Sequence, residues 1–238
     1  MLQNIKGIVL RCTKYTDNSV IINMYTDKYG LQSYIARGVH SRTSKVKANY
    51  FRGLMLLDMI ATKKGKAGLE SISEVTGARS LTLEFDFTKS SIALFLNELL
   101  YKTIHEEEAN PGLFEFLVNS LELLSLKEDN CANFHLLFML RYSKYLGFYP
   151  SENFSATNKY FDMQEGRFVS DRPVHVYYLD ETLSRYIYEL MNEKFETCEQ
   201  VRITNDERRS LMNALIEYYK LHNVLSADLT SQAVLAQL

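Results

Sequence analysis

The chain has 238 residues, of which 46% are hydrophobic and 24% charged, as in ordinary soluble globular proteins of one large or two modest domains. It has no run of about 18–20 apolar residues that could span a bilayer, and its N-terminus does not resemble a signal peptide. We therefore expect a cytoplasmic protein with no membrane segment. The three cysteines lie far apart and form no CxxC pair, which excludes a zinc ribbon.

Charge is distributed unevenly along the chain, although the net charge is only −2. Residues 1–80 hold 13 Lys and Arg against 5 Asp and Glu, whereas residues 81–238 hold 14 against 24. Such asymmetry indicates that the basic part of the chain meets a polyanion. The alternative is a solvated surface that happens to be rich in lysine.

The basic part of the chain predicts a β-barrel. Seven of the ten glycines lie here between short apolar runs, which is typical of strands joined by tight turns. The predicted strands are Ile5–Arg11, Ser19–Thr26, Leu31–Arg37, Leu54–Thr62 and Leu69–Thr76. Five strands with an irregular link after the third outline an OB barrel, although an SH3-like barrel has a similar strand count.

After residue 80 the apolar residues recur at helical spacing. Helices are predicted at Ser90–His105, from Pro111 with Asn110 as cap, at Ala132–Tyr145, at Asp180–Glu193, and from a capping box of Thr204 and Glu207 to His222. Tyr160–Val169 predicts a short hairpin. The sequence therefore predicts an α+β multidomain fold. A five-stranded β-barrel at 1–79, of the OB or the SH3-like type, is followed by a mainly α-helical domain at 80–238, with a small β-hairpin insertion at about 151–172.

Basic side chains gather in two predicted loops of the barrel. The link after the third strand and the turn between the last two strands supply our predicted contacts to nucleic-acid phosphates: Arg37, Arg42, Lys45, Lys47, Lys63, Lys64 and Lys66, with Arg11 and Lys14 as further candidates. Such cations neutralise phosphates without reading the base sequence. Interleaved rings could stack on bases where they are exposed, or pack in the core where they are not: Tyr25, Tyr29, Tyr34, Tyr50 and Phe51.

The sequence shows no enzyme signature. It contains no P-loop, GxSxG or HExxH pattern, and its five histidines are not at ligand spacing. The run His105–Glu108 indicates a charged helix end more than a metal site. A metal-dependent nuclease would need a carboxylate cluster, and the acidic residues of the barrel are mostly apart. We therefore predict no catalytic residue, no metal and no cofactor.

Several short motifs resemble, in the same order, the RecO family of bacterial DNA-repair proteins. They are Gly7–Arg11 (GIVLR), Tyr25–Gly30 (YTDKYG), Ile35–Arg42 (IARGVHSR), Asn97–Leu100 (NELL), Leu140–Arg141 with Leu146–Pro150 (LGFYP), and Ala214–His222. The resemblance implies an OB barrel followed by a helical domain, in a recombination mediator of the bacterial nucleoid. Such proteins bind single- and double-stranded DNA, anneal strands, and act with RecR and the single-strand-binding protein to load the recombinase RecA.

Two features bear on what the resemblance implies. Many family members carry a four-cysteine zinc module after the segment that Leu146–Pro150 resembles. Ser151–Arg172 contains no cysteine, so we predict a variant without zinc. In some members the helical domain binds the acidic tail of the single-strand-binding protein, and Arg141 lies in the matching segment as our partner-binding candidate. The alternative function is a protein–protein adaptor whose barrel binds a protein partner and not DNA.

Overall fold

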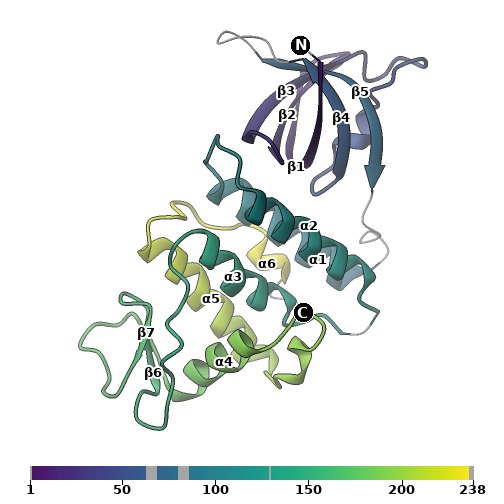
Figure 1. The fold of residues 1–238 in the computed structure, drawn as a ribbon. Helices are drawn as coiled ribbons and strands as arrows, with labels where there is room; N and C mark the ends of the chain where they lie inside the picture. Colours follow the sequence, from purple (N-terminus) through teal and green to yellow (C-terminus); the bar gives the residue numbers. More distant parts are fainter. Residues whose placement is uncertain (1, 63–68, 80–85, 129, 236–238) are drawn as a thin grey trace. The chain divides into compact units, whose positions relative to one another are not determined.

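The computed structural model describes residues 2–62, 69–79, 86–128 and 130–235 (Figure 1). Its contacts divide the chain into two compact units, Met1–Leu126 and Lys127–Leu238. The first unit holds the barrel and the two helices that follow it, and the second unit holds the remaining helices and a small sheet. The predicted boundary at 79/80 lies where the strands end and the helices follow. That it also separates two folding domains stays a prediction.

Five strands of the first unit close into a barrel in the order β1-β2-β3-β5-β4. They are β1 (Leu2–Thr16), β2 (Ser19–Thr26), β3 (Gly30–Arg37), β4 (Leu56–Thr62) and β5 (Glu70–Arg79). Antiparallel pairing joins β1 to both β2 and β4, and a parallel pairing of β3 with β5 closes the barrel. This is the arrangement of an OB barrel, which confirms the predicted fold class.

The interior of the barrel is filled by apolar side chains from every strand and from the link after β3. Besides the strand residues, the link contributes Val39, Val46 and Phe51, each at most 4% exposed. Phe51 belongs to a short 3-10 helix, Ala48–Phe51. Burying one large apolar side chain contributes about 1.5–3 kcal/mol. The link is therefore held in place by its own apolar residues.

Two helices follow the barrel within the first unit: α1 (Phe87–Thr103) and α2 (Pro111–Leu126). The side chain of Asp86 caps α1 by accepting from the amide of Lys89 at 3.0 Å. The side chain of Asn110 accepts from the amide of Leu113 at 3.0 Å, as predicted for a cap that precedes a proline. None of the helices in the described parts of the chain is long and apolar enough to cross a membrane.

The second unit is built on packed helices: α3 (Phe134–Tyr145), α4 (Glu181–Asn192), α5 (Asn205–Leu221) and the short α6 (Gln232–Leu235), with a 3-10 helix at Cys198–Gln200. The predicted capping box of α5 is confirmed: the amides of Thr204 and Glu207 each donate to the other residue's side chain. Tyr219, fully buried, donates from its hydroxyl to the carbonyl oxygen of Met139 at 2.7 Å, which fixes α5 against α3.

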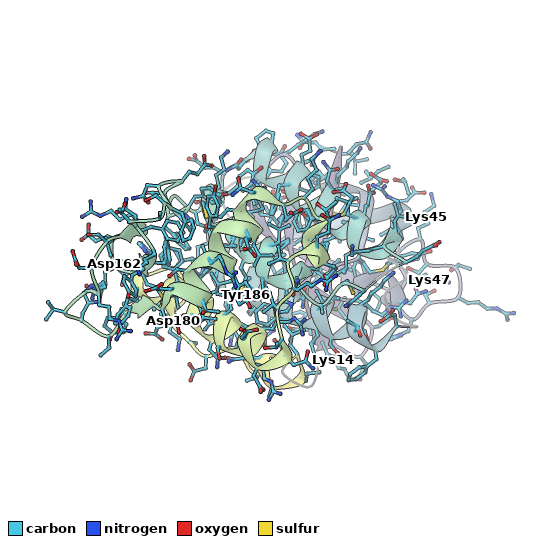
Figure 2. The ribbon with its side chains drawn as sticks, turned by 90° about the horizontal axis from the view of Figure 1, so that it is seen from below. Lys14, Lys45, Lys47, Asp162, Asp180 and Tyr186 are labelled. Carbon is cyan, nitrogen blue, oxygen red and sulfur yellow. The ribbon has the colours of Figure 1, made fainter. Side chains whose placement is uncertain are left out.

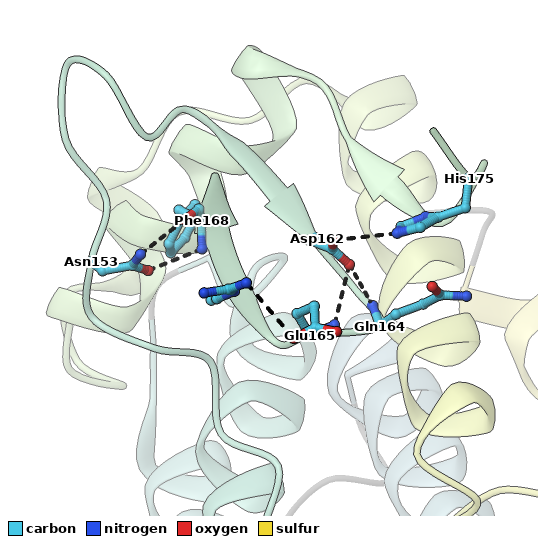
Figure 3. A network of polar contacts seen from close by, with 7 residues as sticks. Asn153, Asp162, Gln164, Glu165, Phe168 and His175 are labelled. Atoms are coloured by element: carbon cyan, nitrogen blue, oxygen red, sulfur yellow. Dashed lines mark hydrogen bonds and ion pairs between the residues drawn. The ribbon is translucent and has the colours of Figure 1, made fainter. Parts of the chain in front are cut away.

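The predicted hairpin is confirmed and is part of a three-stranded sheet in the order β7-β6-β8. Its strands are β6 (Tyr160–Asp162), β7 (Arg167–Val169) and β8 (Tyr178–Leu179). No pattern predicts β8, because a strand of two residues is too short to show alternation. Polar side chains hold the sheet together (Figure 3): Asp162 accepts from two turn amides and contacts His175 at 3.3 Å, and Asn153 bonds both backbone groups of Phe168.

Candidate nucleic-acid interface

The basic link after β3 is fixed to the end of the barrel at which β1 turns into β2. The amide of Gly38 donates to the carbonyl oxygen of Asn18 at 2.7 Å, and the amide of His40 donates to the side-chain oxygen of Asn18 at 3.2 Å. On the other side, the amide of Val75 in β5 donates to the carbonyl oxygen of Lys45 at 3.2 Å. The link therefore lies between the β1–β2 turn and β5, and its cations occupy one rim.

Four predicted phosphate contacts come together on this rim. Arg37, at the end of β3, donates to the hydroxyl of Ser71 at 3.4 Å. Lys47 donates to the carbonyl oxygen of Arg42 at 3.0 Å, and the side chain of Lys45 remains 67% exposed. Figure 2 labels Lys45 and Lys47 on the barrel part of the molecule. We call these four residues, with Lys14, the basic rim.

Lys14 joins the basic rim from β1. It precedes the β1–β2 turn, whose Asn18 bonds the link, and its side chain is 71% exposed. Lys14 and Lys45 each form an ion pair with a carboxylate, Asp17 at 2.7 Å and Glu74 at 3.0 Å. Exposed pairs of this kind contribute only about 0–1 kcal/mol, so a phosphate can replace the carboxylate at little cost.

The other predicted contacts are placed differently. Arg11 lies over the ring of Tyr101 in α1, 5.1 Å from its centroid, and donates to its hydroxyl at 2.7 Å. Its guanidinium therefore already packs the barrel against α1, and a DNA contact by Arg11 stays a prediction. Lys63, Lys64 and Lys66 lie outside the described residues.

Most of the predicted stacking rings belong to the core. Tyr34 and Phe51 pack inside the barrel and the fully buried Tyr25 lies against Phe114 of α2, 6.3 Å between ring centroids, so these three rings are closed to bases. Burial, and next the charge of Glu106, raises the pKa of Tyr25 to about 12. Asn18 was not among the predicted site residues, because its role depends on backbone groups about 20 residues away in the chain and leaves no local pattern.

Arg141, the predicted partner contact, has a structural role in the second unit. Its guanidinium donates to the carbonyl oxygens of Met191 and Glu193, both at 2.9 Å. These carbonyls lie at the C-terminal end of α4, where a cation is favoured by the helix dipole. Arg141 therefore satisfies the end of α4, and its contact with a partner stays a prediction.

A pocket of about 300 Å³ opens in the second unit beside the start of α5. It is lined by Asn130, Asn133, Glu199, Val201, Arg202, Ile203, Thr204 and Arg208. Arg208 is held in place by bonds from Nε to the side-chain oxygen of Asn133 and from Nη2 to the carbonyl of Ile203, both at 3.0 Å. The exposed Arg202 and the half-buried Arg208 make this pocket basic on one side.

Two titratable groups lie close to this pocket. Burial, reinforced by the charge of Arg208, lowers the pKa of His135 to about 3, so this histidine is neutral in the folded protein. Burial also raises the pKa of the Glu199 carboxyl, although bonding to the amide of Asn133 opposes the shift. Within the described residues, no group of three or more His, Cys, Asp or Glu side chains could hold a metal ion.

Comparison with known proteins agrees with this architecture. The family model for the recombination protein O N terminal region matches residues 1–81, and the model for its C terminal region matches residues 84–227. The chain is 36% identical to the DNA repair protein RecO of Bacteroides fragilis, over 93% of both chains. It is 36% identical to that of Flavobacterium psychrophilum, over 91% of this chain and 90% of the relative.

A third relative extends the match over almost the full length. The chain is 30% identical to the DNA repair protein RecO of Azobacteroides pseudotrichonymphae, over 99% of this chain and 98% of the relative. The two family models together span the barrel, its helices and most of the second unit. The fold, the order of its parts and these matches lead to one conclusion: the chain belongs to the RecO family of DNA repair proteins.

Proposed function

We propose that this protein is a DNA-binding recombination mediator that holds single- and double-stranded DNA on the basic rim. The observation that carries the proposal is the placement of Lys14, Arg37, Arg42, Lys45 and Lys47 on one end of a closed barrel. Cations on a rigid scaffold neutralise phosphates and release counterions, which favours binding to any sequence. The predicted OB domain at 1–79 would thus be the DNA-binding part of the chain.

Annealing follows from contacts made only to phosphates. If two strands are held by their backbones, their base edges stay free to find each other. The protein would then present annealed or single-stranded DNA for recombinase loading, together with RecR, on strands covered by the single-strand-binding protein. It would act on the nucleoid of the bacterial cytoplasm. None of these steps requires a catalytic residue, a metal or a cofactor.

The salt dependence of DNA binding tests the basic rim. We expect the variant Arg42→Gln/Lys45→Gln to weaken binding to an oligonucleotide, and each lost phosphate contact to lower the log–log slope against salt by about 0.7 on a single strand. The matched control is Lys6→Gln/Lys28→Gln, which removes the same charge near the β2–β3 turn, at the other end of the barrel. Equal losses in the two variants would show that only the overall charge matters.

The pocket beside α5 is our proposed site for the acidic tail of the single-strand-binding protein. Arg202 and Arg208 would meet the carboxylates of the tail, while Val201 and Ile203 supply an apolar wall. We expect Arg202→Ala to weaken binding of a labelled acidic peptide, whereas Arg209→Ala on α5, which does not line the pocket, should leave it unchanged. Arg141→Ala would test the earlier candidate in the same assay.

The protein–protein adaptor remains the alternative function. It predicts that the wild-type protein fails to shift either single- or double-stranded DNA at physiological salt. Under that outcome the cations of the basic rim would bind an acidic protein partner. The salt dependence of DNA binding would then not differ between Arg42→Gln/Lys45→Gln and Lys6→Gln/Lys28→Gln.

A further inference from the structure

Tyr15 is an exposed aromatic ring on the barrel that the proposed phosphate contacts do not explain. Its exposed fraction is 60%. The barrel residues at 2–62 and 69–79 include five other tyrosine and phenylalanine side chains, and each of them is buried or half-buried. Tyr15 is thus the most exposed of the tyrosine and phenylalanine rings in these ranges, and the exposed imidazole of His40 lies on the link that Asn18 holds. The predicted first strand ends at Arg11, four residues before Tyr15, whereas β1 continues to Thr16.

The backbone sets Tyr15 apart from its neighbours. Lys14 pairs with Val20 and Thr16 pairs with Ser19, so Tyr15 is an extra residue of β1 with no partner on β2. This is a β-bulge at the tip of the hairpin. Bulges of this kind occur at barrel rims and next to functional sites, where they change the direction of a side chain.

The tip of this hairpin is continuous with the basic rim. Asn18, three residues beyond Tyr15, accepts hydrogen bonds from the amides of Gly38 and His40 at 2.7 and 3.2 Å. Lys14 is the immediate neighbour of Tyr15 and is labelled on the barrel in Figure 2. A nucleic-acid backbone held by the link would therefore pass close to the tip of the hairpin that carries Tyr15.

We propose that Tyr15 stacks on an unpaired base of the strand whose phosphates lie on the basic rim. The inference rests on the proposed DNA-binding function and adds a preference for single strands. Unpaired bases stack on aromatic rings whatever their identity, since each base has a π-face. Bases in a duplex already stack on each other and offer no free face. Cations would thus hold either form of DNA, and Tyr15 would discriminate between them.

Removing either partner of the stack tests the proposal. We expect Tyr15→Ala to lower affinity for an oligothymidylate about tenfold or more, in the range measured for loss of one base–aromatic stack. Tyr15→Phe should bind as the wild type does. For a strand of the same length built of abasic sites, Tyr15→Ala and the wild type should bind equally. The salt slope should be the same in all of these cases, because no phosphate contact is lost.

The matched control is Phe87→Ala, which removes a ring of similar exposure, 62%, from the first turn of α1. It should not change the affinity. A second measurement needs no variant: 2-aminopurine in the strand should lose fluorescence when the wild-type protein binds. Unchanged oligothymidylate affinity in Tyr15→Ala, with reduced affinity in Arg42→Gln/Lys45→Gln, would overturn the role of Tyr15 alone. Failure of the wild type to bind any DNA would overturn the proposed function as well.

Discussion

The backbone amide of Leu31 donates a hydrogen bond of 2.8 Å to the carbonyl oxygen of Glu106, and this bond ties the start of β3 to the segment between α1 and α2. Gly30, immediately before it, has φ +62°. A Cβ atom at Gly30 would lie 2.4 Å from the carbonyl oxygen of Glu108 and 2.5 Å from that of Glu106. The turn between β2 and β3 can thus approach this segment only without a side chain.

Gly30→Ala should therefore destabilise the first unit more than backbone strain alone would. A left-handed backbone costs an L residue roughly 1–2 kcal/mol. At Gly30 the added Cβ must also push the turn away from the carbonyls of Glu106 and Glu108. The control is Gly38→Ala, which has a similar φ of +72° but whose Cβ would meet nothing nearer than Ser44 Oγ at 3.9 Å. Urea unfolding of both variants measures the difference. Equal losses of stability would contradict the close approach.

The buried His135 predicts a loss of stability in mild acid. Its pKa of about 3 in the folded protein lies below the ordinary value of about 6.5 that the unfolded chain would have. Between these values the unfolded state binds the additional proton, so stability falls as pH drops below about 6.5 and is unaffected above it. By pH 5 the loss attributable to His135 should reach about 2 kcal/mol.

His135→Gln isolates this contribution from that of other groups. The variant removes the titrating group, so its free energy of unfolding should change less between pH 8 and pH 5 than that of the wild type. The comparison concerns the pH dependence and not the absolute stability, because glutamine at a fully buried position will itself cost stability. Parallel curves for the two proteins would contradict the depressed pKa.

Asn133 should be among the most sensitive polar residues of the second unit. It is 1% exposed, donates from Nδ2 to the carbonyls of Cys198 and Val201 at 3.1 and 2.8 Å, and accepts from Arg208. Replacing it with leucine leaves these groups without their partner, at roughly 1–3 kcal/mol for each buried group. Asn192→Leu, at an exposed amide, is the control, and thermal unfolding should separate the two variants clearly.

The three cysteines should differ sharply in reactivity. Cys12 is exposed, whereas Cys131 and Cys198 are buried, and burial together with the charge of Glu199 raises the pKa of Cys198 to about 12. A thiol reagent reacts with the thiolate, so we expect one equivalent to react in the native protein and the other two only after unfolding. Cys12→Ser should remove the native reaction. Rapid reaction of a second thiol would contradict the burial of the core cysteines.

Local patterns predicted most of the secondary structure correctly. The short apolar run predicted at Ser19–Thr26 has the same bounds as β2, and the capping box of Thr204 and Glu207 marked the start of α5. These signals lie within a few residues of the elements that they specify. The extension of β1 to Thr16 was missed because Arg11–Thr16 is exposed on both faces and shows no alternation.

The candidate site was only partly predictable for a related reason. The cations of the link could be read from composition, since phosphate binding needs charge more than exact geometry. Asn18 and the bulge at Tyr15 could not, because the first acts through its contact with a distant amide and the second through an irregularity in pairing. Arg141 is a cation, as a contact to an acidic partner requires, but its guanidinium donates to carbonyls at the end of α4. No local sequence pattern reveals that contact.

The pairing of β3 with β5 is the shortest in the barrel among the described residues, with Tyr34 beside Glu70 and Ile35 beside Ser71. Arg37 bridges the same two strands through its bond to Ser71. We expect the barrel to open first at this short β3–β5 pairing, which we call the seam. Amide hydrogens along the seam should therefore exchange with solvent faster than those between β1 and β2. Because the basic rim spans the seam, a DNA strand bound on the rim would hold β3 and β5 together, and amide exchange at the seam would slow.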